Sequence, residues 1–208
     1  MTVIAIDGPA AAGKGTLART LAAQYGLAYL DTGLLYRAVA RRARDTGADP
    51  IAVARDLKED DLSAQGLRDA VISQEASRVS AIPEVRTALT EFQVAFAGRP
   101  GGAVLDGRDI GTVICPEADL KLFVTASVEA RAARRHAELV AAGFTDDFSS
   151  VLEEIQIRDA RDSGRATVPL KPAADAVTID TSDLDIAEVR ARAFALVDAL
   201  RQTQAYPA

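Results

Sequence analysis

The sequence GPAAAGKGT at Gly8–Thr16 directly follows the apolar run TVIAID at 2–7. The apolar run predicts a buried parallel strand, and TLARTLAAQYG at 16–26 predicts an amphipathic helix closed by Gly26. A glycine-rich turn between a strand and a helix aims backbone N–H groups inward, where they suit the oxygens of a polyphosphate. A flexible turn of small residues is the alternative, but the flanking strand and helix favour a phosphate-binding loop.

The loop follows the spacing G-x-x-x-x-G-K, with one extra glycine, Gly15, between Lys14 and the hydroxyl residue Thr16. We expect Gly13 and Gly15 to let the backbone approach the phosphates and Lys14 to reach their β and γ oxygens. A helix should open at Gly15 or Thr16, with an N-terminus that favours negative charge. The predicted ATP-binding residues are Gly8, Pro9, Ala10, Ala11, Ala12, Gly13, Lys14, Gly15 and Thr16.

The composition fits one compact domain, because a chain of 208 residues with 49% hydrophobic content can bury a full core. A formal net charge of −6 argues against nucleic acid polymers and anionic membranes as partners, since both require a basic surface. The single cysteine, Cys115, excludes an internal disulfide and a metal site built from cysteines. With no signal or long apolar span recognised, we expect a cytoplasmic monomer.

The rest of the chain alternates apolar runs with long helical patterns, which predicts an α/β fold. Its expected form is a P-loop NTPase core with a parallel five-stranded sheet flanked by helices. The expected strands are TVIAI, AYLD, AVLDG, KLFVTA and AVTID. Two segments interrupt the alternation: 37–98, which is helical in pattern without a convincing strand, and the charged segment 158–171. Both should lie over the carboxyl ends of the strands, where ligands of open α/β sheets bind.

A second anion site is predicted by IRDARDSGRATVPLKP at 157–172, where Arg158, Arg161 and Arg165 are three and four residues apart. On a helix this spacing places three guanidinium groups along one face. A salt-bridge ladder with Asp159 and Asp162 is the alternative. Next to a phosphate loop, an anion site is favoured, because phosphoryl transfer concentrates negative charge that planar, always-charged donors can bind.

The segment LDGRDIGT at 105–112 supports the same chemistry. Asp106 ends a buried apolar run, where P-loop enzymes keep a carboxylate near Mg²⁺, and Arg108 and Asp109 follow in the loop above the sheet. A polar turn is the alternative interpretation. In LDTGLLYRAV at 30–39, Arg37 lies about a turn and a half into a predicted helix.

Taken together, five segments resemble the bacterial cytidylate kinases over most of the chain: IDGPAAAGKGT, LDTGLLYRAVA, IPEVRTAL, LDGRDIGTVICPEADLKLFVTASVEARAARR and RDARDSGRATVPLKPAADAVTIDTS. The resemblance implies a nucleoside monophosphate kinase with a core at about 1–36, 99–157 and 172–208. It also implies a nucleotide-binding insert at about 37–98 and a short lid at about 158–171. The implied reaction is phosphoryl transfer from ATP, with Mg²⁺, to CMP or dCMP.

The resemblance also implies roles for individual residues. It implies catalysis by Lys14, Arg108, Arg161 and Arg165, and contact with the phosphates by Arg37, Arg108 and Arg165. Reading of the cytosine would fall to Ser77, Arg86 and Asp109, and contact with the sugar to Arg158 and Asp162. The expected metal ligands are Thr16 and Asp106.

One departure and two alternatives remain. Many family members carry a three-stranded insert, whereas 49–77 has no run of alternating β-formers of that length, so the insert is expected to be trimmed and mostly helical. Another small-molecule kinase, such as an adenylate or shikimate kinase, is a possible function. A nucleotide-dependent switch is another, although no Asn-Lys-x-Asp segment for reading guanine is present.

Overall fold

The computed structural model describes residues 1–164 and 169–205, and its centre is one parallel sheet with the strand order β2-β3-β1-β4-β5. The strands are β1 (Val3–Asp7), β2 (Ala28–Asp31), β3 (Ala103–Gly107), β4 (Leu120–Thr125) and β5 (Val177–Asp180). Each coincides with one of the five apolar runs. The predicted fold class is therefore confirmed.

One face of the sheet is covered by α1 (Lys14–Tyr25) and α8 (Ile186–Ala205). Leu17 and Leu21 of α1 and Val197 of α8 pack against Ile4 and Ile6 of the central strand. These side chains are almost completely buried, and burial of each contributes about 1.5–3 kcal/mol. The apolar stripe of α1 thus fixes the helix that follows the glycine-rich loop.

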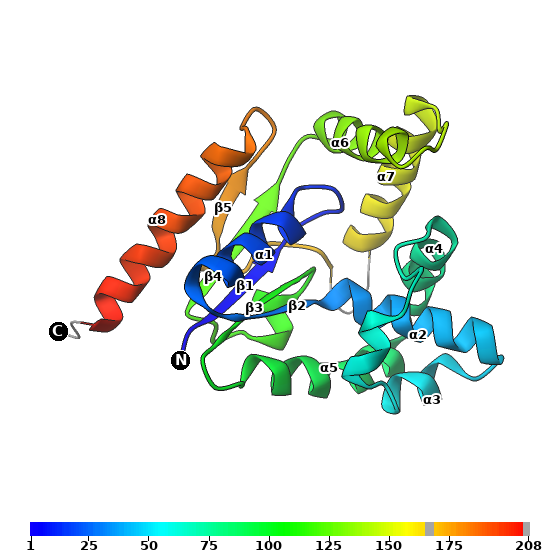
Figure 1. Cartoon of the computed structure of the whole chain (residues 1–208), viewed down its shortest axis with the longest axis horizontal. Coiled ribbons are helices and arrows are strands. Elements are labelled where there is room, and N and C mark those ends of the chain that lie inside the picture. The colour runs from blue at the N-terminus through cyan, green and yellow to red at the C-terminus, as the bar shows by residue number, and fades with distance from the viewer. Residues whose placement is uncertain (165–168, 206–208) are drawn as a thin grey trace.

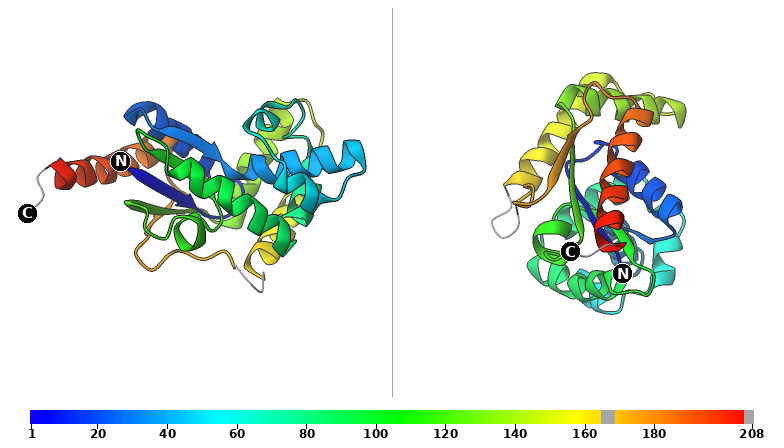
Figure 2. Two further views of the ribbon diagram at one scale, coloured as in Figure 1. Left: turned by 90° about the horizontal axis from the view of Figure 1, so that it is seen from below. Right: turned by 90° about the vertical axis from the view of Figure 1, so that its left-hand side faces the viewer.

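The opposite face is covered by α2 (Thr32–Thr46) and α5 (Pro83–Ala97), which pack Leu35, Val39 and Leu89 against Leu105 of β3. Between them lie α3 (Pro50–Arg55), the 3₁₀ helix η1 (Glu59–Ser63) and α4 (Ala70–Val79). The segment 37–98 is described throughout and contains no strand, as the sequence predicted. These helices gather at the side of the molecule away from both chain termini (Figures 1 and 2).

A second pair of helices faces this group across the carboxyl ends of the strands (Figure 1). They are α6 (Val128–Ala141), which Ser127 caps by accepting a hydrogen bond from Ala130 N at 3.2 Å, and α7 (Phe148–Ser163). The two helices share a small core of Ala132, Val151 and Ile155. The single π-helical turn η2 (Ile110–Ile114) follows β3.

Candidate active site

A cleft of about 610 Å³ opens where β1, β2 and β3 end, bounded by α4 on one side and α7 on the other. Most of the predicted site residues line this one cleft: Ala10, Ala11, Ala12, Gly13, Lys14, Gly15, Thr16, Arg37, Ser77, Arg86, Asp106, Arg108, Asp109, Arg158, Arg161 and Asp162. Two predicted residues, Gly8 and Pro9, do not line it. Arg165 lies outside the described residues.

The glycine-rich loop presents its backbone to the cleft. Helix α1 begins at Lys14, slightly earlier than expected, because Gly13 takes the left-handed conformation (φ 90°) that starts the helix. Lys14 is buried and donates to the Pro9 carbonyl at 2.7 Å. Burial and the neighbouring charge of Arg108 lower the pKa of Lys14. An anion bound in the loop would compensate the ammonium charge at this position.

Gly8 is required by packing. Its φ of +144° is one that glycine readily adopts, and a β-carbon built there would lie 1.9 Å from the carbonyl oxygen of Val124 on β4. The role of this glycine is thus to let the chain pass close to the neighbouring strand as it leaves β1.

A buried carboxylate stands beside the loop, at the end of β3. Tyr29 donates to Asp106 Oδ2 at 2.6 Å, and Thr32 donates to the Asp106 carbonyl at 2.8 Å. Burial, reinforced by the charge of Asp31, raises the pKa of Asp106. A β-carbon built on Gly15 would lie 3.5 Å from Asp106 Oδ2, so the carboxylate reaches the phosphate loop.

The described residues fit a magnesium ion that is shared with substrate phosphates. No group of three His, Cys, Asp or Glu side chains that could hold a metal by itself occurs in the described part of the chain. Mg²⁺ does not need such a group, because it keeps several waters and binds through one or two carboxylates plus phosphate oxygens. Thr16 and Asp106 line the same cleft and carry hard oxygen atoms that could bind such an ion.

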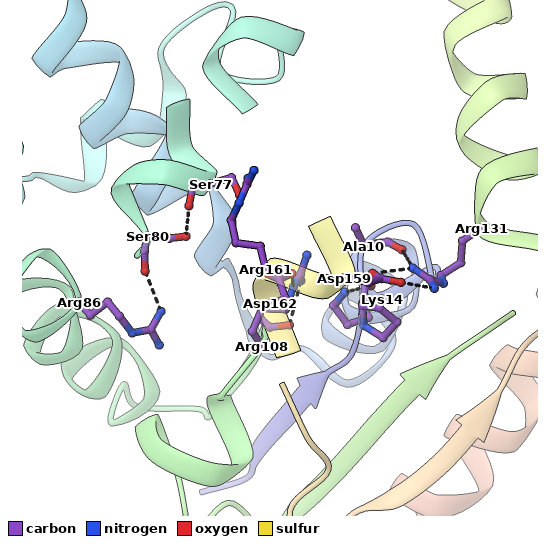
Figure 3. A network of polar contacts seen from close by, with 12 residues as sticks. Ala10, Lys14, Ser77, Ser80, Arg86, Arg108, Arg131, Asp159, Arg161 and Asp162 are labelled. Atoms are coloured by element: carbon purple, nitrogen blue, oxygen red, sulfur yellow. Dashed lines mark hydrogen bonds and ion pairs between the residues drawn. The ribbon is translucent and has the colours of Figure 1, made fainter. Parts of the chain in front are cut away.

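The predicted base-reading residues come from three elements: Ser77 lies on α4, Arg86 on α5, and Asp109 directly precedes η2. Figure 3 shows Ser77 and Arg86. The carboxylate of Asp109 accepts a short hydrogen bond from Nη2 of Arg86, and both side chains are nearly buried. Arg86 also donates to the Ser80 carbonyl at 3.3 Å and lies over the ring of Tyr36 at 5.9 Å. A guanidinium and a carboxylate are thus held side by side at the cleft wall.

Helix α7 contributes two further arginines to the cleft. Arg158 and Arg161 lie on it and line the cleft, which supports the predicted arginine face for the two residues that the structure describes. Arg161 donates to the Ser77 hydroxyl of α4 at 2.6 Å, so it bridges the cleft. Arg108 donates to Asp162 at 2.8 Å, joining the loop after β3 to α7. Asp159 pairs with Arg131 of α6.

Three residues were missed by sequence reasoning: Asp7, Tyr29 and Arg131. Asp7 is buried at the end of β1 and accepts hydrogen bonds from Ile110 N at 2.8 Å and Gly111 N at 2.7 Å. It therefore anchors the turn that follows Arg108 and Asp109, and burial raises its pKa to about 6. The signal was present, because a carboxylate ending a buried strand is the feature that drew attention to Asp106.

Comparison with known proteins identifies the family. The family model for cytidylate kinase matches residues 4–199. A cytidylate kinase of Methylocella silvestris is 58% identical over 94% of this chain and 94% of its own. One of Cereibacter sphaeroides is 55% identical over 97% of both chains. A solved gluconokinase of Sinorhizobium meliloti, at 16% identity and a TM-score of 0.52 over 98% of this chain and 95% of its own, supports the fold alone. The chain belongs to the cytidylate kinase family.

Proposed function

We propose that this chain transfers the γ-phosphoryl group of ATP to CMP, producing ADP and CDP. The observation that supports this function best is that one cleft combines the phosphate loop with a second set of arginines and with the polar side chains of Ser77, Arg86 and Asp109. A nucleotide switch needs only the first of these. A nucleoside monophosphate kinase needs all three, because donor and acceptor must meet in line within a site that excludes water.

At the donor end, the loop amides of 10–16 and Lys14 would hold the ATP phosphates. Thr16 and Asp106 would hold Mg²⁺, directly or through water, and the ion would offset negative charge on the bridging oxygens. Tyr29 orients the Asp106 carboxylate through its hydrogen bond. No covalent intermediate is required, since positioning and charge stabilisation suffice for phosphoryl transfer.

At the acceptor end, the arginines would bind the CMP phosphate and the group in transfer; they are Arg37, Arg108, Arg158, Arg161 and Arg165. Arg158 and Asp162 would also contact the sugar, and we propose that dCMP is accepted as well as CMP. The cytosine edge offers acceptors at O2 and N3 beside a donor at N4. A hydroxyl, a guanidinium and a carboxylate complement that edge, and Ser77, Arg86 and Asp109 supply them.

We further propose that the chain acts as a cytoplasmic monomer, with a core at about 1–36, 99–157 and 172–208. The insert at about 37–98 would carry CMP-binding residues, and the lid at about 158–171 would close over the phosphates. In the part of the chain that the structure describes, no helix combines the length and the apolar character needed to cross a membrane.

Asp109→Asn tests the base-reading assignment. The carboxylate can accept from the N4 amino group of cytosine and would face the O4 carbonyl of uracil with like polarity, whereas an amide can present its NH₂ group to O4. We expect kcat/KM for CMP to fall by about 10- to 100-fold and the gap to UMP to narrow, since a mismatched polar pair costs about 1–3 kcal/mol. The measurement is kcat/KM for both nucleotides in both proteins.

The matched control is Asp45→Asn, which removes a carboxylate from an exposed pair with Arg41 on α2 and should leave both values unchanged. An equal fall for CMP and UMP in the Asp109 variant would assign Asp109 to the phosphates or the metal instead.

A further inference from the structure

Arg131 makes a buried junction outside the predicted set of substrate ligands. Its side chain, on α6, is only 4% exposed. Its Nε donates to the Ala126 carbonyl at 3.0 Å, and its Nη1 donates to the carbonyl of Ala10 in the phosphate loop at 3.4 Å. The same guanidinium forms a fork with both oxygens of Asp159 on α7, at 2.9 and 2.5 Å (Figure 3). One side chain therefore links the end of β4, the phosphate loop and α7.

Asp159 lies on α7 next to the arginines that this helix presents to the cleft. It follows Arg158 and lies two residues before Arg161, both of which line the cleft. Its side chain is 24% exposed, so the pair is shielded from solvent more than a surface ion pair. A bidentate arginine–carboxylate pair fixes both the distance and the orientation of the groups that carry it.

Two contacts that α7 makes with other parts of the cleft wall, among the residues that the structure describes, are of a different kind. Arg161 contacts Ser77, and Asp162 contacts Arg108, so each involves residues proposed to bind substrate. Substrate would compete for those side chains when it enters. The bridge from Arg131 to Asp159 uses neither partner for substrate and can persist through the reaction.

We propose that Arg131 is a positioning residue which, through Asp159, holds α7 in register with the phosphate loop and so places the arginines of α7 on the transferring phosphoryl group. This inference rests on the proposed function. The bridge between Arg131 and Asp159 then raises kcat, in addition to stabilising the packing of α6 against α7.

Two variants test the proposal: Asp159→Asn, which keeps the shape and removes the charge, and Arg131→Lys, which keeps the charge and removes the fork. We expect each to lower kcat for CMP phosphorylation by about 10- to 100-fold, because a small misplacement of catalytic groups is costly. KM for CMP should change by less than about threefold, since the base-reading residues are untouched. A loosened α7 should also admit water, so ADP should form in excess of CDP.

Glu59→Gln is the matched control. Glu59 forms the same kind of fork with Arg99, at 3.1 and 2.5 Å, on the exposed surface between η1 and the end of α5, and neither residue lines the cleft. Its kcat, KM and ratio of ADP to CDP should match those of the wild type. Melting temperature and the folded fraction are measured for every variant, and kcat is expressed per folded molecule.

The results distinguish failure of the positioning role from failure of the proposed function. A reduced kcat per folded molecule with a nearly constant KM in both variants supports the positioning role. Wild-type kcat per folded molecule in either variant overturns it, whether or not the melting temperature falls. A wild-type protein that makes no CDP from CMP overturns the proposed function, and this inference with it.

Discussion

Replacing Lys14 by alanine is expected to lower kcat for phosphoryl transfer by about 10²- to 10³-fold, or about 3–4 kcal/mol, because it removes a charge contact made in the transition state. The folded protein should persist. Lys14 is buried, donates only to the Pro9 carbonyl among the hydrogen bonds seen for it, and lies near the charge of Arg108. Its loss therefore relieves a buried charge and should leave the melting temperature unchanged or raise it.

The check is kcat for CMP phosphorylation together with thermal unfolding of the same protein. Lys58→Ala, which removes an exposed ammonium from the insert, is the control and should behave as the wild type. A folded Lys14 variant that retains most of its kcat would remove the phosphate loop from the mechanism.

Arg108→Ala is expected to lower kcat by about 10³-fold or more, the range seen when an arginine that stabilises a transferring phosphoryl group is lost. Arg108 is the cation that connects the two ends of the cleft. It lowers the pKa of Lys14 through its charge, and it donates to Asp162 of α7.

Arg108→Lys should recover little of the activity, because an ammonium keeps the charge without the planar set of donors. Arg99→Ala removes an exposed guanidinium at the end of α5 and serves as the control. Steady-state kcat in the three variants decides the matter: near wild-type activity in Arg108→Ala would show that the loop after β3 plays no part in the transfer.

The strands and the phosphate loop were predictable because they depend on local pattern. Each strand is a short apolar run, and Gly8–Thr16 has the spacing of a phosphate-binding loop. The start of α1 was expected slightly too late, since Gly13 could not be recognised from sequence as the left-handed residue before the helix. The turn η2 has no repeating pattern and was not predicted.

The pairing of charges in the site was the least predictable feature. The spacing of Asp159 and Asp162 suits a ladder within α7 and a set of contacts to other helices equally well. The structure pairs them with Arg131 and Arg108, which lie far away along the chain. These two contacts depend on how α7 packs on α6 and over the loop after β3.

Transfer of a phosphoryl group to a nucleotide acceptor in this cleft is tested most directly by the rate of ADP release from ATP with Mg²⁺, measured with and without CMP. We expect the protein alone to release ADP at a small fraction of the rate reached with CMP, and CDP then to appear in an amount equal to the ADP. ADP release at the same rate whether or not CMP is present would contradict it and would favour a nucleotide-hydrolysing switch.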